Sequence, residues 1–468
     1  MTETRSITTS LLGHSRNVAL AALLVALPIG LASASQSEHA SAKAADADEA
    51  AEAEMVPVSL PTSAGAASAT AEDAEAKGDV VPVGTTQDRA ALERDTRQAV
   101  NKALRWLAEQ QEVEEVDGQL VGYWRNDVGF KLNTSYRIEV QNGRHPGVTA
   151  LACLAFMANG HYPGRGAYGE VVRRGMNFIL HAIPSSADGV DGFISFDGSR
   201  MYSHAFAALF LAELLGMSNL NASEEEYLRQ KLRRAVAMIV ERQNDHGGWR
   251  YAPGSTDSDM SQVVCQLQAL RAAQSVGIRV PVQTINEARE HVANSYVTRS
   301  EAGQHRWRTP HLEGEFQYQY SQQPTRTSWT LTAAGLVALQ QAGVYHQFEH
   351  PNGRTYSLDS TIQRLTQHPR TRRIGGHDFD QNPRGQIPFC YFYGHYYAAQ
   401  GIYQYGREEP EVWDEWKTYV QQRFLRHFRT IPGEDKGFWS DQIGNNYATA
   451  MACLVLQLHH EYLPIFLK

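Results

Sequence analysis

The segment TAMACLVLQL, residues 449–458, is the last helical segment that the sequence predicts, and it is almost entirely apolar. The terminal helix of an open helical array normally presents a polar face, because one of its sides meets water. Residues 449–458 offer no such face. We therefore expect another helix to cover this segment, and the first segment of the same kind, TALACLAF at residues 149–156, is the natural partner.

Apolar segments of this kind recur along the chain, each preceded by an amphipathic helix and a loop that often holds glycine and an aromatic residue. The apolar helices are predicted to begin near Gly147, Tyr202, Asp259, Ser328, Tyr393 and Asn446. Their amphipathic partners are predicted at residues 95–111, 168–181, 225–243, 282–297, 358–367 and 411–428. Glycines are expected to end five of the apolar helices, at Gly160, Gly216, Gly277, Gly343 and Gly406.

A repeat of about 60 residues that contains two helices is typical of an array in which each unit buries its apolar face against its neighbours. Together with the apolar final helix, the repeat predicts an all-α fold, a closed α/α toroid of six helical hairpins. The apolar helices would form its inner ring and the amphipathic helices its outer ring. An open solenoid is the alternative architecture.

The N-terminus has the pattern of a secretory signal peptide. Arg5 and Arg16 precede an uncharged apolar run at residues 18–31, and the small residues 32–34 follow it. We expect residues 1–34 to be cleaved as the protein is exported to the periplasm or cell envelope. An uncleaved membrane anchor is the alternative, although the run is short and contains proline and glycine.

Residues 35–87 are predicted to be a disordered acidic linker, which leaves residues 88–468 for the toroid. Large apolar side chains are almost absent from this linker, so it cannot bury enough surface to fold. Ten acidic and two basic residues between positions 35 and 86 account for the net charge of −8 of the whole chain. The remainder is close to neutral and lacks a basic surface for nucleic acid. No integral membrane domain is expected beyond the N-terminal signal.

Three of the four cysteines fall inside apolar helical segments: Cys153, Cys265 and Cys453. We expect them to be small buried side chains rather than members of a disulfide framework. Asp380, Cys390 and His395 lie in one region but lack the spacing of a zinc site. No metal and no other cofactor is therefore expected.

Two helix-to-loop junctions resemble a known repeat. The segment KALRWL at residues 102–107 is followed by Gln111 and, beyond a loop, by Gly122-Tyr123-Trp124, while residues 243–249 are QNDHGGW. Both are similar to the glutamine–tryptophan repeat of squalene–hopene cyclases, so the chain resembles the prenyltransferase and squalene cyclase superfamily, in particular its exported bacterial branch. The resemblance implies a terpenoid cyclase-like toroid and, for an enzyme, an isoprenoid cyclase of class II type or a transferase.

The repeat residues themselves are expected to be structural. Each glutamine would hydrogen-bond the exposed end of the next inner helix, and each tryptophan would pack over the same junction with its N–H paired.

In a closed ring the inner helices begin at one common mouth, where their N-termini favour an anionic group. Asp257-Ser258-Asp259 precedes the third inner helix and matches the first two acids of the Asp-x-Asp-Asp motif of class II terpene cyclases. Met260 occupies the place of the third acid. The resemblance implies that Asp259, supported by Asp257, is the catalytic acid. Capping of the helix by Asp259, with Gln262 as its partner, is the alternative.

Ligand contacts are expected from aromatic and histidine side chains of the other inner helices, because aromatic faces stabilise cations and pack against apolar ligands. These candidates are Tyr202, His204, Trp329, Tyr391, His395, Tyr396 and Tyr447. Packing in the core is the alternative for each of them.

Three functions stay open on this evidence, and the sequence does not decide whether the protein is an enzyme. The first is an exported cyclase- or prenyltransferase-like protein that acts on or binds an isoprenoid or another hydrophobic small molecule. The second is a non-catalytic toroid that binds a ligand or a protein partner of the cell envelope. The third is a polysaccharide-active enzyme, which needs paired carboxylates across a cleft, and the inner helices offer Asp257, Asp259 and Glu213.

Overall fold

The computed structural model describes residues 86–132, 135–183, 190–195, 200–217, 220–302, 312–320, 325–367 and 390–467. Six helices form an inner ring: α3 (Pro146–Met157), α5 (Arg200–Met217), α7 (Met260–Ser275), α9 (Trp329–Gln341), α11 (Tyr391–Tyr405) and α13 (Asn445–Gln457). Six helices surround them: α2 (Thr86–Gln110), α4 (Gly169–His181), α6 (Ala222–Glu241), α8 (Val282–Asn294), α10 (Asp359–Gln367) and α12 (Pro410–His427).

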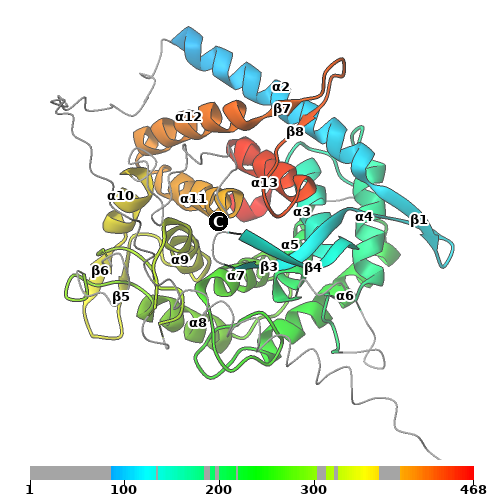
Figure 1. The fold of residues 1–468 in the computed structure, drawn as a ribbon. Coiled ribbons are helices and arrows are strands. Elements are labelled where there is room, and N and C mark those ends of the chain that lie inside the picture. The colour runs from blue at the N-terminus through cyan, green and yellow to red at the C-terminus, as the bar shows by residue number, and fades with distance from the viewer. Residues whose placement is uncertain are drawn as a thin grey trace, which may run out of the picture.

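The inner ring is closed. Each inner helix packs against the next one along the chain, and α13 returns to pack against α3 (Figure 1). At this last contact Gln457 donates its side-chain amide to the carbonyl oxygen of Ala155 at 3.1 Å, and Asn159 donates to Gln457 at 2.6 Å. The predicted toroid of six hairpins is thereby confirmed, and the open solenoid is excluded.

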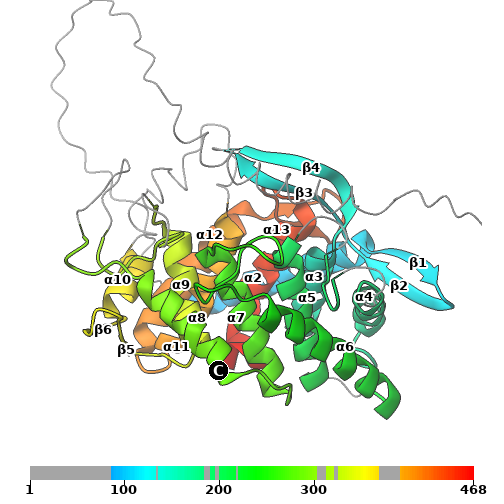
Figure 2. The same cartoon turned by 90° about the horizontal axis from the view of Figure 1, so that it is seen from below.

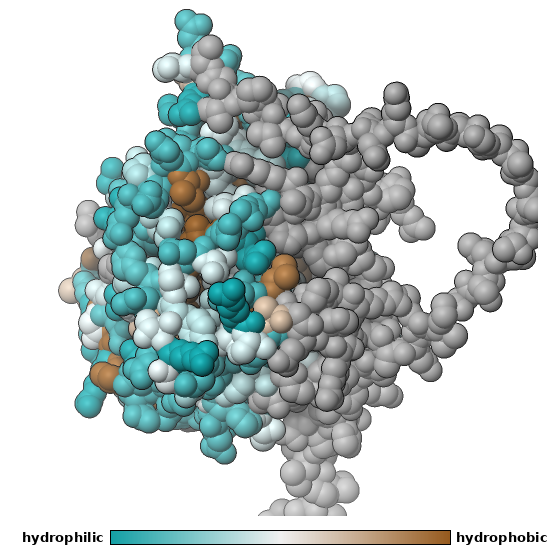
Figure 3. Space-filling view, turned by 90° about the vertical axis from the view of Figure 1, so that its left-hand side faces the viewer, coloured by the Kyte–Doolittle hydropathy of each residue, from teal (hydrophilic) through white to brown (hydrophobic). Residues whose placement is uncertain are grey.

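Burial follows the two rings. Every residue of α3 is buried, as expected for a helix that is apolar all round and therefore surrounded on all sides. The outer helices bury one face each against the inner ring. The face in Figure 3 is largely hydrophilic where it is described, with only isolated hydrophobic residues.

The inner helices begin within two residues of the predicted positions. Helix α2 is longer than predicted and begins at Thr86, so it includes the last two residues of the predicted linker. The rest of the predicted signal peptide and linker lies outside the described residues. Gly160, Gly277 and Gly343 have the positive φ expected of helix ends, whereas Gly216 lies inside α5 and Gly406 has a φ of −67°.

Four antiparallel hairpins were not predicted. They are β1 (Glu112–Val116) with β2 (Gln119–Tyr123), β3 (Arg125–Leu132) with β4 (Ser135–Arg144), β5 (Gln347–Glu349) with β6 (Thr355–Ser357), and β7 (Arg429–Thr430) with β8 (Gly437–Phe438). The first had a recognisable signal, since Asp117 and Gly118 both have positive φ and Asp-Gly favours this type of two-residue turn.

Three tryptophans each connect the loop before an inner helix to the outer helix that precedes it. The indole N–H groups of Trp124, Trp249 and Trp439 donate to the carbonyl oxygens of Leu107, Ile239 and Phe424, each at 2.8 Å. These carbonyls belong to the last turns of α2, α6 and α12, where no partner exists inside the helix. The structural role predicted for the tryptophans is therefore confirmed, and Trp439 extends it to a third junction.

The glutamines act differently from the prediction. Gln111 donates to the carbonyl oxygen of Val171 at 2.8 Å, and Gln243 donates to that of Thr284 at 2.9 Å. Both acceptors lie in the first turn of the next outer helix, not at the end of an inner helix. The repeat glutamines thus join successive outer helices. This pairing is geometrically simpler than the predicted one, because each glutamine lies directly after an outer helix.

Replacement of Trp249 by phenylalanine is expected to lower the free energy of unfolding by about 1–3 kcal/mol, because the buried carbonyl of Ile239 loses its partner. Urea unfolding followed by circular dichroism measures the change. Tyr462, which is 51% exposed, provides the control as Tyr462→Phe. Equal stabilities of the Trp249→Phe variant and the control would show that this bond contributes little.

The C-terminal segment closes one end of the ring. The short helix η3 (Pro464–Leu467) contacts α5, α7 and α11, and the side chains of Leu463, Ile465 and Phe466 are buried. The backbone N–H of Ile465 donates to the carboxylate of Glu213 at 3.2 Å. Figures 1 and 2 show this end of the chain at the middle of the ring, on the side opposite to β3 and β4. The other end, where the inner helices begin, is the candidate mouth of the toroid.

Glu93 joins the two ends of the outer ring. Its carboxylate on α2 lies 2.8 Å from the ammonium of Lys417 on α12 and 3.5 Å from Nε2 of His459 in η2 (Leu458–His460). The hydrogen bond to His459, followed by that to Lys417, holds the pKa of Glu93 far below its ordinary value.

A carboxyl group with a depressed pKa stabilises the fold above its unfolded-state pKa, and this contribution is lost as the pH falls through the folded-state pKa. Glu93→Gln is therefore expected to lower stability at pH 7 and to leave it less dependent on pH below the ordinary carboxyl value of 4.5. Denaturant unfolding at several pH values tests this, with Glu170→Gln as the exposed control. Parallel curves for the wild type and Glu93→Gln would contradict it.

Within the described residues, no helix is both long enough and apolar enough to cross a membrane. Cys153, Cys265 and Cys453 are unpaired and buried as predicted, and Cys390 is unpaired and partly exposed.

Candidate functional site at the mouth of the toroid

The loop between Trp249 and α7 carries the two predicted catalytic aspartates, and Asn244 holds this loop in place. The side-chain amide of Asn244 donates to the carbonyl oxygen of Asp257 at 2.6 Å, and its oxygen accepts the hydroxyl of Ser258 at 3.0 Å. The backbone N–H of Gly248 also approaches that oxygen, at 3.3 Å. The loop therefore returns on itself and brings Arg250 against Asp257.

Asp257 is a solvent-facing carboxylate with fixed orientation. Its Oδ2 atom pairs with Nη1 of Arg250 and accepts a hydrogen bond from the side-chain amide of Gln319 at 3.2 Å. The side chain keeps 25% of its surface exposed, whereas Arg250 keeps only 12%. The largely buried guanidinium and the amide both favour the charged form of the carboxylate.

Asp259 lies deeper and caps α7. Its Oδ1 atom accepts the backbone N–H of Gln262 at 3.1 Å and the hydroxyl of Ser261, which confirms the capping interpretation. Its Oδ2 atom has no hydrogen-bond partner, and Nε of Arg250 lies 3.9 Å away. Burial raises the pKa of Asp259, while the Ser261 hydroxyl and the Arg250 charge act in the opposite direction. The side chain has no exposed surface, so it supports the site from below.

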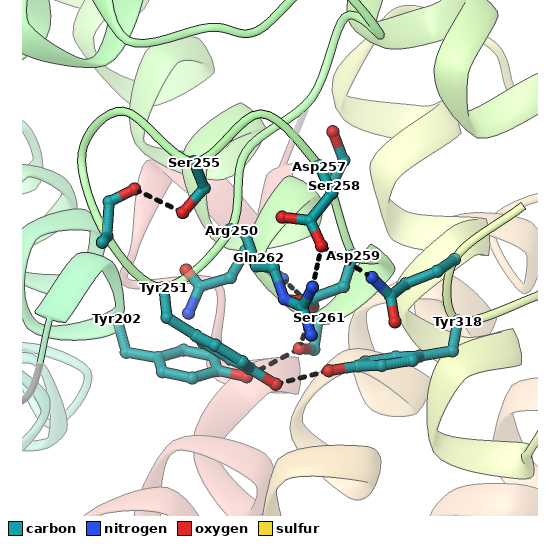
Figure 4. A network of polar contacts seen from close by, with 12 residues as sticks. Tyr202, Arg250, Tyr251, Ser255, Asp257, Ser258, Asp259, Ser261, Gln262 and Tyr318 are labelled. Atoms are coloured by element: carbon teal, nitrogen blue, oxygen red, sulfur yellow. Dashed lines mark hydrogen bonds and ion pairs between the residues drawn. The ribbon is translucent and has the colours of Figure 1, made fainter. Parts of the chain in front are cut away.

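Three tyrosines lie beside the aspartates, with their hydroxyl groups turned toward one another (Figure 4). The hydroxyl of Tyr202 lies 2.6 Å from that of Ser261, and the hydroxyls of Tyr251 and Tyr318 share a hydrogen bond. Burial raises the pKa of all three phenols, so they remain neutral hydroxyl groups. The guanidinium of Arg326 lies 4.3 Å from the centre of the Tyr318 ring. The mouth thus combines aromatic rings, hydroxyls and charged groups.

Polar contacts cross the middle of the ring between α7 and α11, which are not neighbours in it. The hydroxyl of Tyr393 donates to the carbonyl oxygen of Ser261 at 2.5 Å, and that of Tyr396 donates to the side chain of Gln268 at 3.2 Å. Gln268 in turn donates to Gln400 at 2.5 Å. Tyrosine and glutamine side chains therefore fill this part of the described interior.

His204 was predicted to contact a ligand, but it faces the outer ring. Its Nδ1 atom accepts the backbone N–H of Ile194 at 3.1 Å, and its Nε2 atom donates to the carbonyl oxygen of Ala235 on α6 at 3.1 Å. Burial lowers the pKa of His204 to about 3, so the ring is neutral at physiological pH. Both nitrogens are engaged within the fold, which makes this histidine structural.

Trp329, Tyr391 and His395 also point away from the mouth. The indole N–H of Trp329 donates to Leu365 of α10 at 3.2 Å. Nδ1 of His395 donates to the carbonyl oxygen of Tyr391 at 2.8 Å, and both rings pack against Phe424 of α12. Burial lowers the pKa of His395 to about 4. Of the remaining predicted contacts, Tyr396 lies in the filled interior, and Tyr447 is buried near the start of α13.

Four residues of the mouth were missed: Arg250, Tyr251, Tyr318 and Gln319. Arg250 and Tyr251 directly follow the Gly-Gly-Trp turn, and this proximity to the aspartates was the available signal. Tyr318 and Gln319 come from a loop 59 or more residues later, and only the fold brings them to Asp257. Asp380 lies outside the described residues, and among those described no three histidine, cysteine or acidic side chains are grouped as metal ligands.

Comparison with known proteins identifies shared architecture only. No protein-family model matches the chain, and no curated protein matches it. An inactive variant of an α-1,6-mannanase from Salegentibacter sp. HEL1_6 in complex with α-1,6-mannotriose is 6% identical, with a TM-score of 0.48 over 78% of this chain and 98% of that one. An α-amylase from Clostridium perfringens is 9% identical, with a TM-score of 0.46 over 77% and 97%. A β-1,3-1,4-glucanase from Paenibacillus sp. X4 is 10% identical, with a TM-score of 0.42 over 78% and 91%.

These findings correct the resemblance drawn from residues 102–124 and 243–249. The named structures are described as mannanase, amylase and glucanase, not as squalene cyclases or prenyltransferases, and no family model supports the latter. The tryptophan pattern has a physical origin instead, since it pairs the last-turn carbonyls of outer helices in this toroid. The assignment as an isoprenoid cyclase, transferase or isomerase is therefore wrong.

Proposed function

We propose that the protein is a polysaccharide-active enzyme whose site is the mouth around Asp257. The observation that carries this proposal is the position of Asp257, a partly exposed carboxylate that pairs with Arg250 and accepts a hydrogen bond from Gln319. A carboxylate that faces solvent in a fixed orientation can act as the base or nucleophile of glycoside cleavage.

The surroundings of Asp257 suit a sugar. Sugars present apolar ring faces and many hydroxyl groups, so they are bound by aromatic rings together with hydrogen-bonding side chains. Tyr251 and Tyr318 supply rings, and Arg250 and Gln319 supply donors. In this proposal Asp257 touches the substrate, and Asp259 is a positioning residue that caps α7 and approaches Arg250.

Two sequence features agree with this proposal. Residues 1–34 have the pattern of a signal peptide, and export behind the linker 35–87 would bring the toroid to the polysaccharides of the cell envelope or the surroundings. The toroid itself is close to neutral, which does not favour nucleic acid as a partner.

A non-catalytic toroid that binds a glycan or an envelope protein is the second candidate. The filled interior favours this second candidate. Tyrosine and glutamine side chains occupy the space between α7 and α11, so a ligand would be bound at the surface of the mouth.

The test is incubation of the purified protein with α-mannan, starch, mixed-linkage β-glucan and xylan, followed by measurement of new reducing ends and of binding. Release of oligosaccharides by the wild type supports the enzyme. Binding of a glycan without release supports the second candidate. If the protein neither cleaves nor binds any member of a broad glycan panel, a polysaccharide function is ruled out.

A further inference from the structure

Arg200 connects the β3–β4 hairpin to the mouth of the toroid. Its Nη2 atom donates to the carboxylate of Glu139 on β4 at 3.2 Å. Its guanidinium carbon lies 6.0 Å from the centre of the Tyr251 ring. The backbone N–H of Met201, the next residue, donates to the carbonyl oxygen of Tyr251 at 3.0 Å. Because Tyr251 belongs to the loop that carries Asp257, these contacts place Arg200 at the mouth, beside that loop.

The hairpin that carries Glu139 is anchored at its base to another part of the ring. Asn446 in the first turn of α13 donates to the carbonyl oxygen of Arg125 at 2.8 Å, and Asn126 of β3 donates to that of Ile443 at 2.9 Å. Strand β3 also contacts α3, which stands between α13 and α5 in the ring. The hairpin therefore extends from the start of α13 to that of α5, on the side of the ring away from the C-terminal segment (Figure 2).

The backbone at Arg200 is strained. Its φ is 64°, in the left-handed region where a Cβ atom is disfavoured and glycine is preferred. An arginine at this position therefore has a local cost that a glycine would not have. This cost offers a way to separate a role of the side chain in binding from a role in folding.

The guanidinium of Arg200 has donors available for a ligand. A guanidinium carries five N–H groups, and among the described residues Glu139 is the one that pairs with it. The side chain keeps 22% of its surface exposed, compared with 12% for Arg250, which pairs with Asp257. A carboxylate ligand would meet the like charge of Glu139, whereas the hydroxyl groups of an uncharged sugar would not.

We propose that Arg200 is a glycan-binding residue of the mouth, positioned by Glu139, and that it recognises an uncharged sugar beside Tyr251; this inference rests on the proposed function. Arg200 donates hydrogen bonds to hydroxyl groups of that sugar, which belongs to the chain that Asp257 acts on. The substrate class is thereby narrowed to neutral glycans. The same contact is made in the bound substrate and in the transition state, so it contributes to KM rather than to kcat.

The experiment compares Arg200→Gly with the wild type, by steady-state kinetics on a neutral polysaccharide that the wild type cleaves or by calorimetric titration with one that it only binds. Glycine adopts a φ of 64° without strain, which offsets its greater freedom in the unfolded chain, so the melting temperature should stay close to that of the wild type. We expect KM, or the dissociation constant, to rise about 10–100-fold, as for the loss of hydrogen bonds from a charged group. The change in kcat should be much smaller.

Two further variants test how Arg200 acts. Arg200→Lys keeps the charge and a donor, so it should recover part of the affinity. Glu139→Ala should raise KM less than Arg200→Gly does, and it should have no further effect when both substitutions are combined, because Glu139 acts through Arg200. The control is Arg233→Gln on the outer helix α6, at a side chain 54% exposed.

An unchanged KM in Arg200→Gly would overturn the role of Arg200 while leaving the proposed function intact. A lower melting temperature together with a loss that falls mainly on kcat would do the same, because it would show a structural role. Tighter binding of a uronic acid polysaccharide than of any neutral glycan would contradict the assigned substrate class. If the wild type neither cleaves nor binds a glycan, the proposed function itself fails, and the role of Arg200 fails with it.

Discussion

Asp257→Asn is expected to abolish most glycan cleavage, with a fall in kcat/KM of about 10²–10⁴-fold. Asparagine matches the size of the aspartate and can still accept the hydrogen bond from Gln319, but it has no charge to take a proton from water. Arg250 would lose its ion pair, yet it remains near Asp259, so the loop should stay in place. Steady-state kinetics on the polysaccharide cleaved by the wild type measures the effect.

The matched comparison is Asp259→Asn on the same loop. Asp259 is buried and caps α7, and asparagine caps a helix as well as aspartate does, so this replacement should change the melting temperature little and affect kcat less than Asp257→Asn does. If Asp259→Asn removed activity without a change in stability while Asp257→Asn remained active, the roles assigned to the two aspartates would have to be exchanged.

Phe466→Ala is expected to lower the free energy of unfolding by about 3–5 kcal/mol, as is usual for truncation of a buried aromatic side chain. Phe466 is only 2% exposed, and its segment lies against three inner helices. The side-chain amide of Gln404 on α11 also donates to its carbonyl oxygen at 2.6 Å, which fixes this part of the backbone. The loss should appear in urea unfolding and as a lower melting temperature.

The control for Phe466→Ala is Tyr462→Ala, four residues earlier and 51% exposed, which should change stability by less than about 0.5 kcal/mol. Equal and small effects of both substitutions would mean that the C-terminal segment is not an integral part of the core. A large loss at Phe466 alone would show that the closed end of the ring is maintained by this segment.

The architecture could be predicted because it depends on periodicity and composition. Residues 449–458 have no polar face, which requires a neighbour on every side, and α3 provides the missing contact. The inner-helix starts were predicted within two residues because capping residues such as Asp259 and Ser328 stand directly before them. Six of the eight strands in the described residues were missed because two to five residues carry too little alternation to be distinguished from a loop, whereas β3 and β4 were missed despite their eight and ten residues.

Side-chain directions could not be predicted on helices that are buried all round. An amphipathic helix shows which face meets the core, but α5 and α11 are buried on almost every side, so their sequence does not distinguish the axis from the outer ring. His204 and His395 were therefore expected at the ligand and instead face outer helices. Tyr318 and Gln319 could not be predicted because a distant loop supplies them.

The position of Asp257 relative to a repeat tryptophan was a signal that was not used. Asp257 stands between Trp249 and the inner helix that follows it. Every such loop enters the mouth of a closed toroid. Acidic residues in these loops are therefore better candidates for chemistry than polar residues within the helices themselves.

The contact between the first and the last outer helix sets the order of events during synthesis. Glu93 meets Lys417, which follows it by 324 residues, and α2 also packs against α12 and α13. A nascent chain therefore cannot complete its ring until almost its entire length has left the ribosome, and such distant pairing is slow. Until then Leu104 and Leu107 of α2, both buried in the finished protein, remain in contact with water, so the unfinished chain is the form most exposed to aggregation.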